Sequence, residues 1–353
     1  MIVFDAHLDL AWNAIDWNRD LKKTVWDIRK DESGMSGRCR GNATVSLPQM
    51  REGKVALAIA TLLPKLIREV QPPLQFFQSR EAAYASARGQ LAYYRALEES
   101  DRVRLLTTAD ELNAHTTEWL TDESGDHPLG FVLSMEGADA FITADQAEHW
   151  YDLGLRIVGP AHYGLNAYAN GTGSPGGFTS EGKDLLRQMQ KAGLLLDVTH
   201  LADDAFWEAM DIYDGPVLAS HHNCRSLVSG DRQLTDEQIR VLLDRDAVIG
   251  SAFDCWMLDP NWIRGQEEWA TVGMEVVVDH MDHICQIAGN SKHVALGTDL
   301  DGGFGKEQSP TDMDTIADLQ KLSELLQARG YSPEDIKGIM YRNWVDFFNR
   351  VWS

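Results

Sequence analysis

Short apolar runs rich in β-branched residues alternate with longer helical patterns along this chain of 353 residues. Most of these runs are apolar throughout, which is typical of parallel strands that are buried on both faces. Strands are predicted at 2–4, 55–62, 130–134, 156–159, 194–197, 217–219, 247–252 and 294–297. This repeated strand–helix alternation favours an α/β fold of the (β/α)8 TIM-barrel type, and the alternative is an open doubly wound sheet.

The segments between the predicted strands have the periodicity of helices. The clearest helical patterns cover 79–99, 180–192, 235–244 and 275–288. Thr235 is followed three residues later by Gln238, which predicts a capping box at the start of its helix.

The chain is predicted to form a single domain over 1–353, because α/β barrels of this length fold as one unit. A charged segment at 18–41 follows the first strand and is predicted to be an inserted loop or lid. A proline-bearing stretch at 63–73 is interpreted as a long loop at the active face. A helical pattern at 332–351 predicts a C-terminal helix that packs across one end of the barrel.

Charge and cysteine usage limit the classes of partner. The sequence has 32 Lys and Arg against 54 Asp and Glu, which gives a formal net charge of −22. An acidic protein repels phosphate backbones and anionic lipids, so neither nucleic acid nor a membrane is an expected partner. The four cysteines lie far apart without a C-x-x-C pair, which favours a reduced compartment and predicts a cytoplasmic location unless a leader has been removed. A homodimer is compatible with these features.

Ionisable side chains follow six of the predicted strands at the point where each strand ends. They are His7, Asp9, Glu136, His162, His200, His221, Asp299 and Asp301. Catalytic groups in barrels come from the C-terminal ends of several strands, so these side chains are expected to converge. A single histidine after a strand is usually an ordinary loop residue, and an Asp-Gly pair such as Asp301 with Gly302 is usually a turn. The coincidence of so many candidates at one edge nevertheless predicts a metal centre.

Imidazole and carboxylate ligands together suit zinc, with manganese, iron and cobalt as competitors. Five of the candidates exceed the needs of one open tetrahedral site: His7, Asp9, Glu136, His200 and His221. They fit two metal ions that share a carboxylate. Many barrel hydrolases bridge their two metal ions with a modified lysine after the fourth strand. This chain has His162 after that strand and no lysine, so Glu136 is the natural bridge. Two ions ~3.5–4 Å apart can activate water and polarise a carbonyl oxygen.

Two other patterns are interpreted as structural. The stretch 171–176 matches G-x-G-x-x-G, but it follows no apolar strand and Pro175 is poorly placed for a helix start, so a dinucleotide site is rejected. His280 and His283 have a spacing that could bind a metal, but their helix is expected on the outside of the barrel.

Several short motifs occur in a fixed order along nearly the whole chain. They are 5–10, Glu136 with Gly137, 155–162, 197–200, Ser220 with His221, Arg232, 279–284 and 297–302. Each motif is weak by itself, whereas their order and spacing together are specific. In this respect the chain resembles the renal (membrane) dipeptidase family, the M19 zinc peptidases of the amidohydrolase-like barrel superfamily.

The resemblance implies a site with two zinc ions. One ion would be held by His7, Asp9 and Glu136, and the other by Glu136, His200 and His221. The resemblance further implies that His162 lies beside the scissile carbonyl, that Arg232 binds the substrate carboxylate and that Asp299 carries the proton.

The chain departs from the family pattern next to two of the implied ligands. Where the family motif reads H-N-D-L-P, this chain has Leu8 in place of Asn and Ala11 in place of Pro. After His221, the residues 222–224 stand where the family usually has small polar residues. These changes leave the ligands intact but alter the pocket, so they affect which dipeptide is preferred. Neither the secretory signal nor the lipid-anchor tail of the animal enzymes is expected here, and the chain is interpreted as more similar to the bacterial members.

The predicted function is that of a zinc-dependent dipeptidase, which cleaves one peptide bond between two free termini. The resemblance implies tolerance of a D-residue at the C-terminal position of the substrate. One alternative is another binuclear-metal hydrolase of amides or esters on the same barrel, which would not need Arg232. A non-catalytic binding barrel is the other alternative, although the complete ligand set argues against it.

Overall fold

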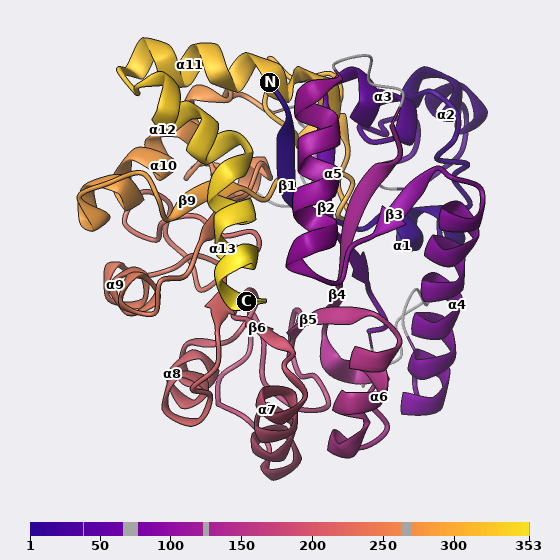
Figure 1. Ribbon diagram of the computed structural model, residues 1–353, viewed down its shortest axis with the longest axis vertical. Coiled ribbons are helices and arrows are strands. Elements are labelled where there is room, and N and C mark those ends of the chain that lie inside the picture. Colours follow the sequence, from indigo (N-terminus) through magenta and orange to yellow (C-terminus); the bar gives the residue numbers. More distant parts are fainter. Residues whose placement is uncertain (38, 66–76, 123–126, 263–269, 353) are drawn as a thin grey trace.

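Eight parallel strands form a nearly closed barrel in the computed structural model, which describes residues 1–37, 39–65, 77–122, 127–262 and 270–352 (Figure 1). The strand order is β7-β6-β5-β4-β2-β1-β9-β8, and a parallel bridge from Ala219 to Ile249 joins the two ends. The strands are β1 Val3–Leu8, β2 Val55–Leu62, β4 Leu129–Glu136, β5 Leu155–Gly159, β6 Leu195–Asp197, β7 Val217–Leu218, β8 Ile249–Ser251 and β9 Val294–Leu296. The predicted TIM-type barrel is confirmed.

Helices surround the barrel (Figure 1). They are α1 Leu10–Ile15, α2 Val25–Asp31, α3 Leu47–Glu52, α4 Arg80–Glu99, α5 Ala109–Thr121, α6 Ala147–Asp152, α7 Ser180–Ala192, α8 Asp203–Ile212, α9 Asp236–Asp244, α10 Glu275–Ala288, α11 Leu322–Arg329, α12 Pro333–Lys337 and α13 Asn343–Val351. The four clearest helical patterns correspond to α4, α7, α9 and α10. The capping box of Thr235 and Gln238 is present at the start of α9, with both reciprocal hydrogen bonds.

Strand β1 is longer than predicted, because its pairing with β2 continues through Leu8. The prediction ended the strand before Asp5, the first charged residue. The carboxylate of Asp5 is buried here, where it accepts hydrogen bonds from Thr298 N at 2.8 Å and Thr298 Oγ1 at 2.6 Å. A buried carboxylate is tolerated when such partners are supplied. His7 therefore lies on the strand itself, with its backbone fixed by the sheet.

One short strand was not predicted. Strand β3, Val103–Leu105, pairs in parallel with the first half of β4, outside the eight-stranded ring. Its three residues include the charged Arg104, so the sequence shows neither a long apolar run nor a clear alternation. Most of the loop expected at 63–73 lies outside the described residues.

The C-terminal segment consists of α12, a π-helical turn at Gly338–Arg342 and α13. It packs against β1 and β9, since the Trp344 indole N–H donates to Leu296 O at 2.9 Å and the Phe348 ring stacks on Phe4 at a centroid distance of 5.7 Å. The segment thereby supports the two strands that lead to His7 and Asp299.

The segment 18–41 contains α2, and a buried ion pair ties it to the loop after β9. The guanidinium group of Arg19 lies 2.8 Å from Glu32 Oε1 and 3.2 Å from Asp301 Oδ2. The carboxylate of Asp301 also accepts a hydrogen bond from Thr44 N at 2.8 Å. Asp301 is therefore a buried anchor of this segment rather than a simple turn residue.

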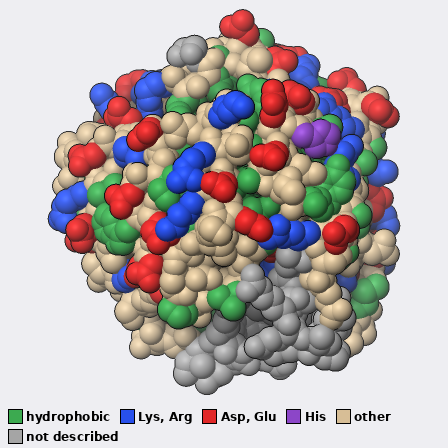
Figure 2. Space-filling model, turned by 90° about the horizontal axis from the view of Figure 1, so that it is seen from below, with side chains coloured by type: hydrophobic (Ala, Val, Ile, Leu, Met, Phe, Trp, Pro, Cys, Tyr) green, Lys and Arg blue, Asp and Glu red, His purple; other side chains and the backbone are tan. Residues whose placement is uncertain are grey.

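Over the described residues, no helix combines the length and the apolar character needed to cross a membrane. Figure 2 shows acidic and basic side chains intermingled over one face of the molecule. On that face, the excess negative charge is thus spread among basic side chains rather than gathered into one patch.

Candidate active site

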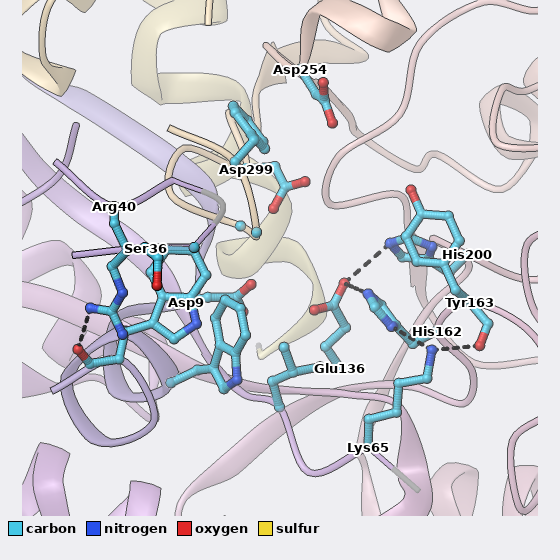
Figure 3. Close-up of a pocket in the computed structure, with 17 residues that line it drawn as sticks. Asp9, Ser36, Arg40, Lys65, Glu136, His162, Tyr163, His200, Asp254 and Asp299 are labelled. Atoms are coloured by element: carbon cyan, nitrogen blue, oxygen red, sulfur yellow. Dashed lines mark hydrogen bonds and ion pairs between the residues drawn. The ribbon is translucent and has the colours of Figure 1, made fainter. Parts of the chain in front are cut away.

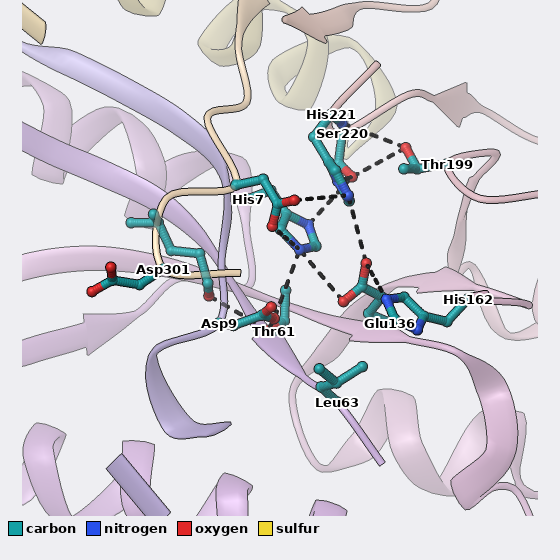
Figure 4. A network of polar contacts seen from close by, with 12 residues as sticks. His7, Asp9, Thr61, Leu63, Glu136, His162, Thr199, Ser220, His221 and Asp301 are labelled. Carbon is teal, nitrogen blue, oxygen red and sulfur yellow. Dashed lines mark hydrogen bonds and ion pairs between the residues drawn. The ribbon is translucent and has the colours of Figure 1, made fainter. Parts of the chain in front are cut away.

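Three of the predicted histidine ligands meet around Glu136 at the carboxyl ends of the barrel strands, and Figure 4 shows Glu136 with His7 and His221. Glu136 ends β4, and its Oε2 lies 3.6 Å from His7 Nε2 on β1. Its Oε1 lies 3.3 Å from His200 Nε2, which follows β6, and 3.6 Å from His221 Nε2, which follows β7. The sequence places these residues up to 214 positions apart, and the barrel brings their ligand atoms into one cluster.

The imidazoles at this cluster are held from behind by hydroxyl groups. His221 Nδ1 lies 2.9 Å from Ser220 Oγ, and His200 Nδ1 lies 3.2 Å from Thr172 Oγ1. The Nε2 atoms of His200 and His221 lie 3.3 Å apart on the inner side. His7 Nε2 is buried and has no hydrogen-bond partner within the described part of the chain. Imidazole nitrogens turned inward with their other nitrogen engaged are the usual arrangement of metal ligands.

Two further carboxylates complete the cluster. Asp9 Oδ1 lies 3.7 Å from His7 Nε2 and accepts a short hydrogen bond from Thr61 Oγ1. Asp299 Oδ1 lies 3.8 Å from His7 Nε2, on the loop after β9, the strand that pairs with β1. The loop needs a glycine at 302, because a Cβ on Gly302 would lie 1.8 Å from Asp299 Oδ1. The close approach of the Gly302 backbone to the Asp299 carboxylate explains the glycine at this position.

The electrostatics of the cluster are those of a cation-binding site. Burial, and then the charge of Glu136, raises the pKa of Asp9 to about 7. Burial lowers the pKa of His7, but the carboxylates of Glu136 and Asp9 outweigh it and raise this pKa to about 10. Burial also raises the pKa of Asp299 well above its ordinary value. Three carboxylates around one imidazole, two of them buried and Asp299 partly buried, attract positive charge, so the donor set fits a metal ion.

The cluster forms one wall of a cavity of about 570 Å³ (Figure 3). Asp9, Glu136, His162, His200 and Asp299 line it on the side of the candidate ligands. The rest of the lining includes Trp12, Trp17, Arg40, Leu63, Lys65, Asp254 and Phe304. Apolar side chains and convergent polar or charged groups thus share the lining, and such a concave site suits a small polar molecule.

His162 lines this cavity, whereas Arg232 is buried and is not among the described residues that line it. His162 Nε2 is 3.9 Å from Glu136 Oε1, and burial lowers the pKa of His162 to about 3. Arg232 is 1% exposed and donates from Nη2 to the carbonyl oxygen of His221 at 3.0 Å. Arg232 therefore does not contribute to the described lining of the cavity. Its Nε–H has no acceptor within the described chain, so one buried donor remains for a ligand.

Sequence reasoning missed several cavity residues. Trp12 stands three positions after Asp9 on α1, and Lys65 stands three positions after the end of β2. Trp17 directly precedes the 18–41 segment and Arg40 lies near its end, and the Arg40 guanidinium carbon lies 5.5 Å from the Trp17 ring centroid. Only proximity to strand ends could have indicated Trp12 and Lys65, and that signal is shared by many loop residues.

The histidine pair on α10 is structural, as interpreted. His280 is buried, and its Nδ1 accepts a hydrogen bond from Cys224 N at 3.0 Å. His283 Nε2 lies 2.9 Å from both Asp236 Oδ1 and Ser226 Oγ. Neither histidine belongs to a group of three close ligand atoms in the described ranges.

Comparisons with known proteins decide the family. A model of the membrane dipeptidases, peptidase family M19, matches residues 1–353. The chain belongs to the M19 membrane dipeptidase family. The predicted class of enzyme, a metallo-dipeptidase, is thereby confirmed, and the clustered candidate ligands support a metal cofactor.

Individual relatives agree with this assignment. An uncharacterized protein in the pqqA 5′ region of Klebsiella pneumoniae is 31% identical over 65% of this chain and 84% of its own length. The dipeptidase tcpJ of Claviceps purpurea is 29% identical over 57% of this chain, but the match spans only 46% of tcpJ. A metallopeptidase structure from Rhodobacter sphaeroides, liganded with a phosphinate mimic of L-Ala-D-Ala, has a TM-score of 0.80. It is 24% identical, with 100% of this chain and 99% of that chain covered, and it shows the same fold.

Proposed function

We propose that this M19 enzyme is a dipeptidase that works with two zinc ions. One ion would be held by His7, Asp9 and Glu136, and the other by Glu136, His200 and His221. The observation that carries the proposal is the position of Glu136, whose two oxygens face His7 on one side and His200 with His221 on the other, at 3.3 to 3.6 Å. Imidazole with carboxylate is a ligand set that zinc favours.

Two bound ions of this kind would activate water for attack and polarise the scissile carbonyl. The residues around them supply the remaining chemistry. His162 donates from Nε2 to the carbonyl oxygen, where negative charge develops during the reaction. Asp299 accepts a proton from the attacking water and returns it to the leaving amine nitrogen. Its contacts with His7 at 3.8 Å and with His221 at 4.0 Å keep the carboxylate over the reaction site.

Recognition of the substrate is assigned to Arg232, which would bind the C-terminal carboxylate of a dipeptide. Its buried guanidinium group and its Nε–H without an acceptor in the described chain support this role. Because Arg232 would bind the carboxylate of the residue that follows the scissile bond, longer peptides would be excluded. The L-Ala-D-Ala mimic bound to the Rhodobacter enzyme supports acceptance of L-Xaa-D-Xaa substrates.

Further proposals concern the organisation of the protein. We propose one domain over 1–353 in which the segment 18–41 forms a lid, because Ser36, Gly37 and Arg40 line the cavity. A cytoplasmic location is supported by the four cysteines, all within the described residues, which form no disulfide. A homodimer remains a prediction that light scattering would test.

A library of dipeptides, including L-Xaa-D-Xaa members, tests the proposed function when hydrolysis and metal content are measured on the same sample. Hydrolysis of free dipeptides but not of their C-terminal amides is the expected result. Cleavage of cyclic amides or phosphoesters with no cleavage of dipeptides would instead favour another hydrolase on the same barrel. Binding without any turnover would favour a non-catalytic barrel.

A further inference from the structure

The loop after β2 places a lysine against His162, on the side of the imidazole away from Glu136 (Figure 3). Lys65 Nζ lies 3.2 Å from His162 Nδ1 and 2.7 Å from the carbonyl oxygen of Tyr163. Lys65, His162 and Tyr163 all line the cavity. Two atoms of the loop after β5 thus hold the ammonium group beside the histidine.

The contact fixes which nitrogen of His162 carries the proton. An ammonium group offers three donors and no acceptor, so His162 Nδ1 must accept. A neutral imidazole that accepts at Nδ1 carries its hydrogen on Nε2. His162 Nε2 faces the site, 3.9 Å from Glu136 Oε1. The opposite tautomer would set an N–H against the ammonium group and present a lone pair to the substrate.

We propose that Lys65 is a positioning residue that holds His162 in its Nε2–H form, so that the imidazole donates to the carbonyl oxygen of the dipeptide. The inference rests on the proposed function and adds a residue to it. Functional histidines are commonly oriented by a carbonyl or carboxylate that accepts from Nδ1–H. Here the polarity is reversed, because the partner donates to Nδ1 and directs the hydrogen to the other nitrogen.

The surrounding packing limits what else the imidazole can do. The His162 ring meets the Tyr163 ring edge to face, with centroids 4.9 Å apart, and the His200 ring lies 4.5 Å away. The backbone N–H of His162 donates to Asn166 Oδ1 at 3.2 Å. These contacts restrict the ring position, so the lysine acts mainly on the location of the proton.

Kinetics of Lys65→Met test the proposal. We expect kcat to fall by about 10- to 100-fold, the range found for partners that orient functional histidines, with KM and metal content nearly unchanged. Lys65→Arg keeps a cationic donor and should recover part of kcat. Lys183→Met is the matched control, because Lys183 lies on α7 and pairs with Glu208 at 3.2 Å, so its kcat should equal that of wild type.

Nitrogen NMR of protein labelled with ¹⁵N-histidine gives a readout that a purely structural role would not move. The His162 signals are assigned by their loss in His162→Gln. In the wild-type holoenzyme we expect a protonated Nε2 and an unprotonated Nδ1, and in Lys65→Met a mixture of both tautomers.

Three results would overturn the proposal. They are a protonated Nδ1 in the wild-type enzyme, a Lys65→Met variant with raised KM and unchanged kcat, and a variant that loses metal. The second would make Lys65 a substrate-binding residue, and the third would make it a structural one. Failure of the wild-type enzyme to cleave any dipeptide would overturn the proposed function instead, and the NMR comparison would still decide the tautomer.

Discussion

His221 and His280 are both almost completely buried, at 1% and 0% exposure, yet their surroundings differ. In each case burial lowers the pKa, which favours the neutral imidazole. His221 Nε2 faces His200 and Glu136 within 3.6 Å. His280 accepts one backbone hydrogen bond from Cys224 and otherwise packs inside the fold. Burial alone therefore does not identify a metal ligand, whereas the convergence of several ligand atoms does.

The largest effect is expected from a substitution at the centre of the first region, the ligand cluster around His221 and Glu136. Glu136→Gln keeps the volume of the side chain but removes the negative charge that faces His7 on one side and His200 on the other. We expect the purified variant to lose bound metal and all measurable dipeptide hydrolysis. Elemental analysis and a hydrolysis assay on one preparation check this. A variant that retains both ions would show that Glu136 is not the bridge.

Asp299→Asn should lose catalysis while it keeps most of the metal. A general acid or base typically contributes 10²–10⁴-fold, so turnover should fall by about that factor. Asn preserves the shape of the side chain but cannot accept a proton from water. Metal content, melting temperature and turnover measured together separate the outcomes. Metal loss in parallel with turnover would make Asp299 chiefly a ligand, and turnover close to wild type would remove it from the mechanism.

Arg232→Met should raise KM for dipeptides far more than it changes metal content. Leaving one partner of a buried charge pair unmatched costs roughly 2–5 kcal/mol, or about 30-fold to several thousand-fold in binding. A dipeptide with an amidated C-terminus should show a similar loss with the wild-type enzyme. Arg225→Met is the control, because Arg225 lies in the same loop and pairs with Asp203 at 2.8 Å. An unchanged specificity constant in Arg232→Met would contradict the assignment.

In the second region, the surroundings of His280, a substitution should change only the stability of the fold. His280→Phe leaves Cys224 N–H without its acceptor, and an unsatisfied buried group costs about 1–3 kcal/mol in the free energy of unfolding. Metal content and kcat should remain those of wild type. Urea denaturation with metal analysis checks both points. Loss of metal in this variant would erase the distinction between the two regions.

The smallest expected effect is a difference in pH dependence. Burial lowers the pKa of His280 to about 4, from about 6.5 in the unfolded chain. Between these values the unfolded state binds more protons, so this histidine makes the fold less stable as pH falls through that window. His280→Phe should therefore lose less stability than wild type between about pH 7 and pH 5. Parallel pH profiles of the two proteins would show that His280 does not titrate in this way.

The sequence predicted the barrel because its central strands are continuous apolar runs, as in β2 and β4, both buried throughout. It failed where tertiary partners decide the outcome. The end of β1 depends on the hydrogen bonds that Thr298 gives to Asp5.

The candidate ligands were predictable because their residue types recur at strand ends. The role of Lys65 was not predictable, because it depends on a contact with His162, which lies 97 positions away in the sequence. The contact of Arg232 with the His221 carbonyl oxygen likewise depends on how the loop after β7 folds. A bridge between Cys224 and Leu234 closes this loop.

The metal content of the purified protein tests the central claim most directly. Elemental analysis after preparation with excess zinc should find close to two zinc ions per chain, and removal by a chelator should abolish dipeptide hydrolysis in parallel. His200→Ala and His221→Ala should each lower the content to about one ion, because they belong to the same half of the site. A wild-type protein that binds no transition metal, or alanine variants that keep full metal and full turnover, would contradict the account.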